Sequence, residues 1–260
     1  MSESLNIALV QYDLYWENPD ANRATIEEML SGVETDVVVL PEMFTTGFSM
    51  NAKALAEPMG GHTFKWMKML ASSLSAAIAG TIIIKEDGNF YNRFLWVNPD
   101  GTTQFYDKRH LFRLSEETSV FTSGSKQPII EYKGWRFLPQ VCYDLRFPVW
   151  TRRTNQDYDV MLYSANWPAS RNNVWETLLS ARAIENQAYS VGVNRIGEDK
   201  MDVQYVGNTA AYNFMGYQIA SATSDSKVTQ ITLSKTELDD FREKFPVHLD
   251  SDAFQLSKDV

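Results

Sequence analysis

The chain has 260 residues, of which 44% are hydrophobic and 22% charged, and its formal net charge is −9. This length permits one large domain or two, and the apolar fraction excludes an intrinsically disordered chain. The negative charge argues against a nucleic-acid-binding protein, because phosphate contacts need clustered Lys and Arg.

The start of the chain predicts a βαβ unit. Residues 5–10 form an apolar run typical of a buried strand. Asn18 followed by Pro19 marks a helix start, and apolar residues then repeat at helical spacing up to Val33. A β-branched run at 36–40 predicts the next strand. We therefore expect a parallel pair of strands covered by a helix.

The pattern continues and then begins a second time near residue 128. Residues 64–74 predict a second helix and 81–84 a third strand. The strands expected next flank an Asn-Pro-Asp-Gly turn, at 91–97 and 102–106. The second series has strands at 129–132, 135–141, 159–163 and 190–194, a helix over 175–182, and hairpin-like segments up to residue 233.

In each half the helices come first and consecutive antiparallel strands follow. No Pro-, Gly- or Ser-rich linker separates the two halves. We predict an α/β fold in which two internally similar αβ halves pack sheet on sheet, as a four-layer α-β-β-α sandwich. Residues 1–260 are expected to form a single domain. Residues 235–260 are expected to be a C-terminal arm, which is either a frayed terminus or a segment that buries Phe245, Leu249 and Phe254 against a second subunit.

The cysteine and histidine content limits the kinds of site that the chain can carry. Cys142 is the single cysteine, so no internal disulfide can form, which is typical of a reducing compartment. No Cys/His cluster has the spacing of zinc ligands. The N-terminus lacks the basic start of a signal peptide, and no apolar run approaches the roughly 20 residues of a membrane span. We expect a cytoplasmic protein that does not contact membranes.

Cys142 is the first candidate for a catalytic residue. A free cysteine is usually a small buried hydrophobic residue. Here, however, it ends the strand predicted at 135–141, and the chain turns immediately after it. A nucleophile at such an elbow is exposed at the edge of the sheet, and the next backbone N–H, that of Tyr143, points at the developing oxyanion.

A thiol with an ordinary pKa of about 8.5 needs a base or a nearby cation to react at neutral pH. Glu42 follows the strand predicted at 36–40, at the end that carries the ligand crevice in open α/β sheets, and could shuttle a proton. Lys108 follows the strand at 102–106 and could favour the thiolate. The alternative for both is a solvated surface charge. A Cys–His pair also stays open, with the three histidines His62, His110 and His248.

Three segments together resemble the nitrilase superfamily of carbon–nitrogen hydrolases. They are residues 40–44 (Leu-Pro-Glu-Met-Phe), 106–111 (Tyr-Asp-Lys-Arg-His-Leu) and 141–148 (Val-Cys-Tyr-Asp-Leu-Arg-Phe-Pro). Their order and separations match that family. The resemblance extends over nearly the whole chain and includes segments 165–168, 181–186 and 193–195.

This resemblance implies an α-β-β-α fold assembled as a homodimer through the α faces. The sequence indicates no metal or organic cofactor, and the expected chemistry needs none. The resemblance also implies a Glu–Lys–Cys triad, which maps to Glu42, Lys108 and Cys142, and a thioester intermediate. A second family glutamate follows the lysine, and Glu116 and Glu117 both qualify. Glu117 is favoured because it lies seven residues before a glycine, as in the family.

Segments 42–48 and 165–168 look most like the omega-amidase branch of this superfamily. These enzymes hydrolyse the terminal amide of 2-oxoglutaramate or 2-oxosuccinamate to a 2-oxo acid and ammonia, and they are linked to methionine salvage. One alternative is an amidase or nitrilase that acts on another small amide, carbamoyl compound or nitrile. Another is a catalytically silent binding or scaffold protein.

Such a substrate carries a free carboxylate, for which arginine is the best-matched cation. Arg146 and Arg171 are the candidates, and a structural salt bridge is the alternative for Arg146. Phe44 and Trp167 are expected to wall the pocket, with Phe121 a weaker candidate. Ordinary core packing is the alternative for these aromatic residues.

Overall fold

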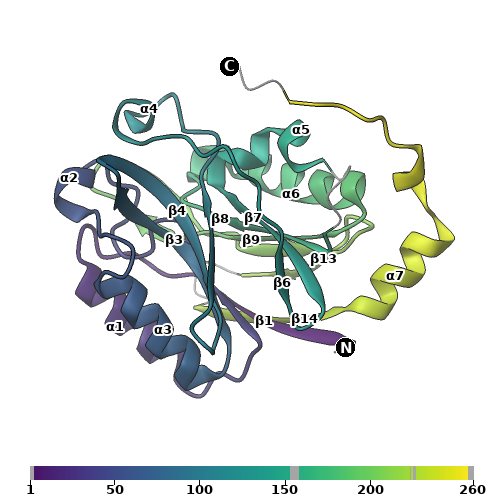
Figure 1. Cartoon of the computed structure of the whole chain (residues 1–260), viewed down its shortest axis with the longest axis horizontal. Helices are drawn as coiled ribbons and strands as arrows, with labels where there is room; N and C mark the ends of the chain where they lie inside the picture. The colour runs from purple at the N-terminus through teal and green to yellow at the C-terminus, as the bar shows by residue number, and fades with distance from the viewer. Residues whose placement is uncertain (1–2, 153–157, 223, 225–226, 257–260) are drawn as a thin grey trace.

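Two six-stranded β-sheets pack face to face in the computed structural model, which describes residues 3–152, 158–222, 224 and 227–256 (Figure 1). The first sheet has the order β14-β1-β2-β3-β4-β5, with β1 (Ser4–Val10), β2 (Val37–Val39), β3 (Ala77–Glu86), β4 (Asn89–Val97), β5 (Thr103–Asp107) and β14 (Val228–Ser234). The second has the order β13-β12-β9-β8-β7-β6, with β6 (Ile130–Tyr132), β7 (Trp135–Val141), β8 (Val160–Ser164), β9 (Tyr189–Val193), β12 (Ala210–Tyr212) and β13 (Gln218–Ser221).

Helices cover the outer face of each sheet (Figure 1). The longer ones are α1 (Pro19–Leu30) and α3 (His62–Leu74) on the first sheet, α6 (Asn172–Asn186) on the second, and α7 (Lys235–Lys244) near the C-terminus. Short elements are α2 (Ala52–Leu55), α4 (Glu117–Val120), α5 (Pro148–Thr151) and the 3₁₀ helices η1 (Cys142–Arg146), η2 (Ala169–Arg171) and η3 (Val247–Asp250). A separate ribbon pairs β10 (Ile196–Glu198) with β11 (Gln204–Val206).

The two sheets repeat one pairing pattern. In the first, β1, β2 and β3 are parallel, β14 pairs antiparallel with β1, and β4 and β5 continue antiparallel after β3. In the second, β7, β8 and β9 are parallel, β6 pairs antiparallel with β7, and β12 and β13 continue antiparallel after β9. The prediction of two similar halves in an α-β-β-α sandwich is therefore confirmed.

Alternate side chains along a strand belong to different hydrophobic cores. Leu5, Ile7 and Leu9 of β1 belong to the core between the sheets, whereas Ala8 and Val10 belong to the core beneath α1 and α3. Successive strand residues point to opposite faces, so a strand buried on both faces reads as a continuous apolar run. The α6 side of the second sheet has its own core, which contains Trp175 and Leu179.

The start of α1 forms as the sequence predicts. The side chain of Asn18 accepts a hydrogen bond from the backbone N–H of Ala21 at 3.1 Å, and Pro19 occupies the first helical position. The cap satisfies a backbone donor that has no partner within the helix, and proline loses nothing there because it has no N–H.

The C-terminal segment differs from the prediction in its first part. Residues 235–244 form the regular helix α7, and its Arg242 is buried against the main body of the same chain. The Arg242 guanidinium bonds Asp159 at 2.9 Å, the carbonyl of Tyr158 at 2.7 Å and that of Gln187 at 2.8 Å. Ser234, whose hydroxyl accepts from the N–H of Glu237 at 3.2 Å, was the available sequence signal for this helix.

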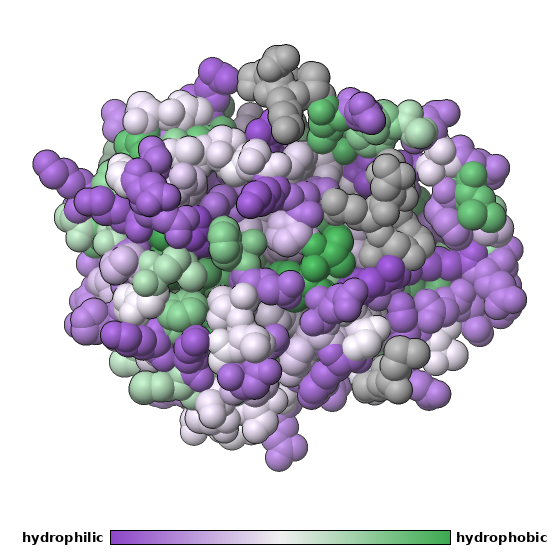
Figure 2. Space-filling model, viewed as in Figure 1, coloured by the Kyte–Doolittle hydropathy of each residue, from purple (hydrophilic) through white to green (hydrophobic). Residues whose placement is uncertain are grey.

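After α7 the chain carries exposed apolar residues, among them Phe245, Leu249 and Leu256. Residues 257–260 of the predicted arm lie outside the described residues. Figure 2 shows that the face seen in this view is mostly hydrophilic, with a small group of apolar side chains near its centre. Within the described ranges, no helix is long and apolar enough to cross a membrane.

Replacing Arg242 by Met should lower the free energy of unfolding by about 3 kcal/mol, because it leaves the buried Asp159 carboxylate with one cation fewer. Lys244→Met is the matched control, since Lys244 is 79% exposed and should change stability by no more than about 0.5 kcal/mol. Urea unfolding of both variants measures the difference. Equal, small changes in the two would show that α7 is not anchored by Arg242.

Candidate active site

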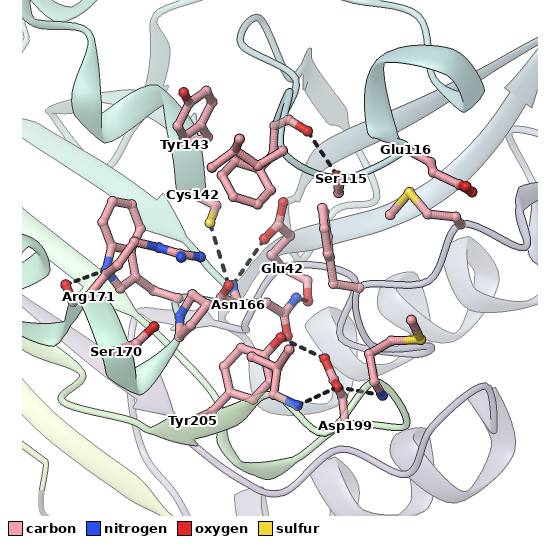
Figure 3. Close-up of a pocket in the computed structure, with 18 of the residues that line it drawn as sticks. Glu42, Ser115, Glu116, Cys142, Tyr143, Asn166, Ser170, Arg171, Asp199 and Tyr205 are labelled. Atoms are coloured by element: carbon pink, nitrogen blue, oxygen red, sulfur yellow. Dashed lines mark hydrogen bonds between the residues drawn. The ribbon is translucent and has the colours of Figure 1, made fainter.

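Three strand ends converge on one cavity of about 580 Å³. Glu42 lies three residues after β2, Lys108 directly after β5 and Cys142 directly after β7, and all three line this cavity. Because β2 and β7 belong to different sheets, the site lies between the two halves of the fold. Figure 3 shows the Cys142 and Glu42 side chains close together, with Asn166 beside both.

The backbone at Cys142 has the strained conformation of a nucleophile elbow. Its φ of +43° lies in the left-handed region, which residues other than glycine rarely adopt. The buried carboxylate of Asp144 holds this turn by accepting from the N–H of Val141 at 3.0 Å, and it also bonds the hydroxyl of Tyr106 at 2.8 Å. The Asp144 carboxylate therefore stabilises the strained backbone at Cys142 through one hydrogen bond across the turn and one to Tyr106.

Lys108 is buried between two buried carboxylates. Its Nζ lies 2.9 Å from Oε1 of Glu42 and 2.9 and 3.0 Å from the two carboxylate oxygens of Glu117. The Lys108 side chain is 1% exposed and those of both glutamates are fully buried. An ammonium can leave water at such a site only because its partners surround it.

Burial and charge act against each other on these pKa values. Burial alone would lower the pKa of Lys108, but the carboxylates of Glu117 and Glu42 outweigh it and hold that pKa well above its usual value. The pKa of Glu117 is raised, first by burial and then by the charge of Glu42, against the opposing effect of Lys108. Lys108 therefore stays a cation at every physiological pH.

The thiol of Cys142 is protonated in the resting site. Burial raises its pKa well above the usual value, the charge of Glu42 adds to this, and Lys108 opposes it. The sulfur lies 3.8 Å from the backbone oxygen of Asn166, to which the S–H donates. Reaction therefore requires a base that takes the proton as the sulfur attacks, and Glu42 is the carboxylate in place to do so.

Two asparagines, neither of them singled out from the sequence as a site residue, hold the Glu42 carboxylate. Asn166 donates its backbone N–H to Oε2 at 3.0 Å and its side-chain Nδ2 to the Glu42 backbone oxygen at 2.6 Å. Asn92 donates to Oε1 at 2.8 Å. A polar residue at a buried position of the apolar strand β4 was the one signal for Asn92, and it does not specify a partner.

Of the two glutamates considered after the lysine, the structure places Glu117 against it. Glu116 is exposed at the cavity rim. The loop fixes Glu117 further, since the N–H of Phe112 donates to its Oε2 at 2.5 Å. Gly124 lets this loop pass close to β5, because a Cβ there would lie 2.1 Å from the backbone oxygen of Asp107.

The expected substrate-binding residues divide into two groups. Tyr143, Trp167 and Arg171 line the cavity. Arg146 is not among its lining residues, and its guanidinium lies over the Trp167 ring, 5.0 Å from the centroid.

Phe44 and Phe121 are core residues in the structure, which corrects the expectation that they wall the pocket. Phe44 is fully buried beneath the outer helices, with its ring 5.9 Å from that of Trp66. Phe121 packs in a separate cluster with Met43 and Ile83. Neither lines the cavity, because the chain reverses after Glu42 and turns Phe44 toward the helical layer.

None of the three histidines lines the cavity, so the geometry does not support a Cys–His pair. His110 lies closest in sequence to a site residue, but its Nδ1 pairs with Asp144 at 2.7 Å and its ring stacks on Phe147, with centroids 3.8 Å apart. Among the described residues, no group of three or more His, Cys, Asp or Glu side chains could hold a metal ion.

Comparison with known proteins gives a consistent result. Residues 6–242 match the family model described as carbon–nitrogen hydrolase. The chain is 46% identical to omega-amidase YafV of Escherichia coli strain K12, over 97% of this chain and 98% of that protein. It is 30% identical to 2-oxoglutaramate amidase of Bacillus subtilis strain 168, over 93% and 95% of the two chains.

Solved structures agree with the fold. XC1258 from Xanthomonas campestris, a CN-hydrolase superfamily protein with an arsenic adduct in its active site, superposes with a TM-score of 0.96. It is 41% identical, and the alignment covers 98% of this chain and 100% of that one. Nit3 of Saccharomyces cerevisiae, at 24% identity, superposes with a TM-score of 0.85 over 95% and 96% of the chains and shows the same fold.

Because the free thiol is protonated, its reaction with iodoacetamide at neutral pH should depend on Glu42 rather than on prior ionisation. We expect the alkylation rate of Cys142 to be nearly constant from about pH 6 to 8. In Glu42→Gln it should be slower and rise about tenfold per pH unit, as for a thiol that must ionise first. Identical pH profiles in the two proteins would exclude Glu42 as the base.

Proposed function

This chain belongs to the carbon–nitrogen hydrolase family, and we propose that it is an omega-amidase that hydrolyses the terminal amide of a 2-oxo dicarboxylic acid monoamide, such as 2-oxoglutaramate or 2-oxosuccinamate. The products are the 2-oxo acid and ammonia. The observation that carries this proposal is one cavity lined by Cys142, Glu42, Lys108 and a further cation, Arg171. The named activities of the two relatives support it.

In the first half-reaction, Glu42 takes the thiol proton as the sulfur of Cys142 attacks the amide carbon. The carbonyl oxygen becomes an oxyanion, which the Lys108 ammonium and the backbone N–H of Tyr143 stabilise. The C–N bond then breaks. Glu42 returns its proton to the departing nitrogen, which leaves as ammonia, and the acyl group stays on the sulfur as a thioester.

In the second half-reaction, Glu42 is again a carboxylate and takes a proton from a water molecule. The resulting hydroxide attacks the thioester, and the same two donors stabilise the second oxyanion. The C–S bond then breaks, and Glu42 gives its proton to the leaving sulfur, which restores the thiol and the carboxylate. Glu117 supports both steps because it holds the Lys108 ammonium in place by two hydrogen bonds. No metal or organic cofactor is required by this sequence of steps.

Arg171 is the residue that we assign to the substrate carboxylate. Lys108 and Arg171 are the two cationic residues among those that line the cavity, and Lys108 is already paired with two carboxylates. Within the described part of the chain, no carboxylate pairs with Arg171, whose guanidinium lies 5.4 Å from the ring centroid of Phe112. A guanidinium can bind a carboxylate through two parallel hydrogen bonds.

We further propose a homodimer formed through the α6 side of the second sheet. Ile184 of α6 and Met215, Tyr217 and Ile219 of the neighbouring hairpin are exposed large apolar residues. The hairpin turn packs beside α6, since a Cβ on Gly216 would contact the Ile184 side chain. Contacts of the C-terminal arm with a second subunit also remain a proposal. A cytoplasmic location is supported by the need to keep the Cys142 thiol reduced.

Cys142→Ala should abolish ammonia release from 2-oxoglutaramate, because no other side chain can form the thioester. Glu42→Gln should reduce turnover nearly as much, and Lys108→Ala should reduce it by at least roughly a hundredfold through loss of an oxyanion donor. Ammonia release on 2-oxoglutaramate, glutamine and a simple nitrile measures both the activity and its substrate class. Turnover by purified Cys142→Ala at the wild-type rate would refute the nucleophile, and a preference for the nitrile would refute the omega-amidase.

Arg171→Met should raise KM for 2-oxoglutaramate roughly 30-fold or more, because the substrate carboxylate loses its charged partner. KM for a neutral amide without a carboxylate should change little. Arg146→Met is the matched control, since the Arg146 guanidinium lies over the ring of Trp167 but Arg146 does not line the cavity, and it should leave KM within about twofold. An equal loss on acidic and neutral amides would contradict the assignment of Arg171.

A further inference from the structure

Asn92 is a buried residue that contacts both carboxylates of the site. It lies on β4 and is fully buried, and it is not among the residues that line the cavity. Its Nδ2 donates to Oε1 of Glu42 at 2.8 Å and to Oε1 of Glu117 at 3.3 Å. Its backbone oxygen accepts the N–H of Lys108 at 3.0 Å.

Lys108 Nζ and Asn92 Nδ2 are thus two donors that bond the same two carboxylate oxygens. These oxygens, on Glu42 and Glu117, belong to groups that repel each other when both are charged, and a single ammonium lies between them. Two carboxylates and one ammonium leave a net negative charge in a buried site. There a fixed dipole stabilises charge more strongly than it would in water. Asn92 supplies that dipole.

The reaction explains why a neutral donor suits this position. Glu42 gains a proton when the sulfur of Cys142 attacks and loses it when ammonia leaves, and it gains and loses a proton again during thioester hydrolysis. Its charge therefore changes twice in each half of the cycle, whereas Lys108 stays charged. A second ammonium would overcompensate the carboxylates when Glu42 is protonated, and a carboxylate would repel them when it is not. A carboxamide can stay bonded to both oxygens through every stage.

We propose that Asn92 is a positioning residue, which fixes the Glu42 carboxylate for proton transfer with Cys142 and keeps Glu117 in place on Lys108. It acts through these three groups and does not touch the substrate. This inference rests on the catalytic roles in the proposed function and adds a residue that those roles require.

The proposal is tested first by separating kcat from KM. Asn92→Ala should lower kcat about 100-fold, the loss typical of a misplaced reacting group, and leave KM within about twofold. Asn186→Ala is the matched control, because Asn186 is a buried amide on α6 that bonds the carbonyl of Arg182 and does not line the cavity. It should lower Tm while retaining kcat.

The isosteric Asn92→Asp gives a signature that a structural role would not. The charged groups that face this position are Glu42 and Glu117, with Lys108 and the Cys142 thiol beside them. When protonated, the new carboxyl group can donate in place of the amide. When ionised, it adds a third negative charge. Activity should therefore be partly retained at low pH and lost as the pH rises, over a range where the wild type stays active.

Alkylation of Cys142 by iodoacetamide keeps this test independent of the omega-amide substrate. Its rate at pH 7 should fall about tenfold in Asn92→Ala, whichever amide the enzyme hydrolyses. Failure of the wild type on 2-oxoglutaramate would therefore refute the proposed function without affecting the result for Asn92. Wild-type kcat and alkylation in Asn92→Ala, a wild-type pH profile in Asn92→Asp, or parallel losses in Asn92→Ala and Asn186→Ala would each overturn the positioning role.

Discussion

One buried ammonium between two buried carboxylates is the interaction on which the site depends. Each of these charges would be costly to bury alone, and the three together bury a net negative charge beside a thiol. Burial, with the charge of Glu42 adding to it, raises the pKa of Cys142 and keeps its proton in place at rest, and the two carboxylates hold Lys108 protonated. In the proposed mechanism, the same three groups that surround the resting thiol supply a base and an oxyanion donor when an amide is present.

The sandwich of two sheets brings these groups together because parallel strands expose their carboxyl ends at the same edge. Glu42 comes from the first sheet and Cys142 from the second, so neither half could form the site alone. Asp144 links the two, since it holds the cysteine turn and also bonds Tyr106 at the end of β5. Lys108 lies two residues after Tyr106, directly after the end of β5.

Residues at strand ends could be predicted from the sequence, and residues within strands could not. The apolar runs that precede Glu42 and Cys142 place both residues at strand ends, and this can be inferred from the local sequence without knowing their tertiary contacts. Asn92 acts through partners 50 and 25 residues away in the chain, and no local pattern specifies them. Phe44 was misassigned because a turn of backbone after Glu42, which the sequence does not determine, directs it into the core. Helix α7 could not be assigned to the core from the sequence, because Leu238 and Arg242 are buried against residues that are distant in the chain, among them Asp159.

In the proposed reaction the substrate amide binds with its carbonyl oxygen on Lys108 and its nitrogen on Glu42. A crystal structure of Cys142→Ala with 2-oxoglutaramate tests this most directly. We expect the carbonyl oxygen to lie about 3 Å from Lys108 Nζ and from the backbone N–H of Tyr143, with the amide nitrogen at Glu42. A substrate bound in the reverse direction, with its carboxylate on Lys108 and its amide at Arg171, would contradict it.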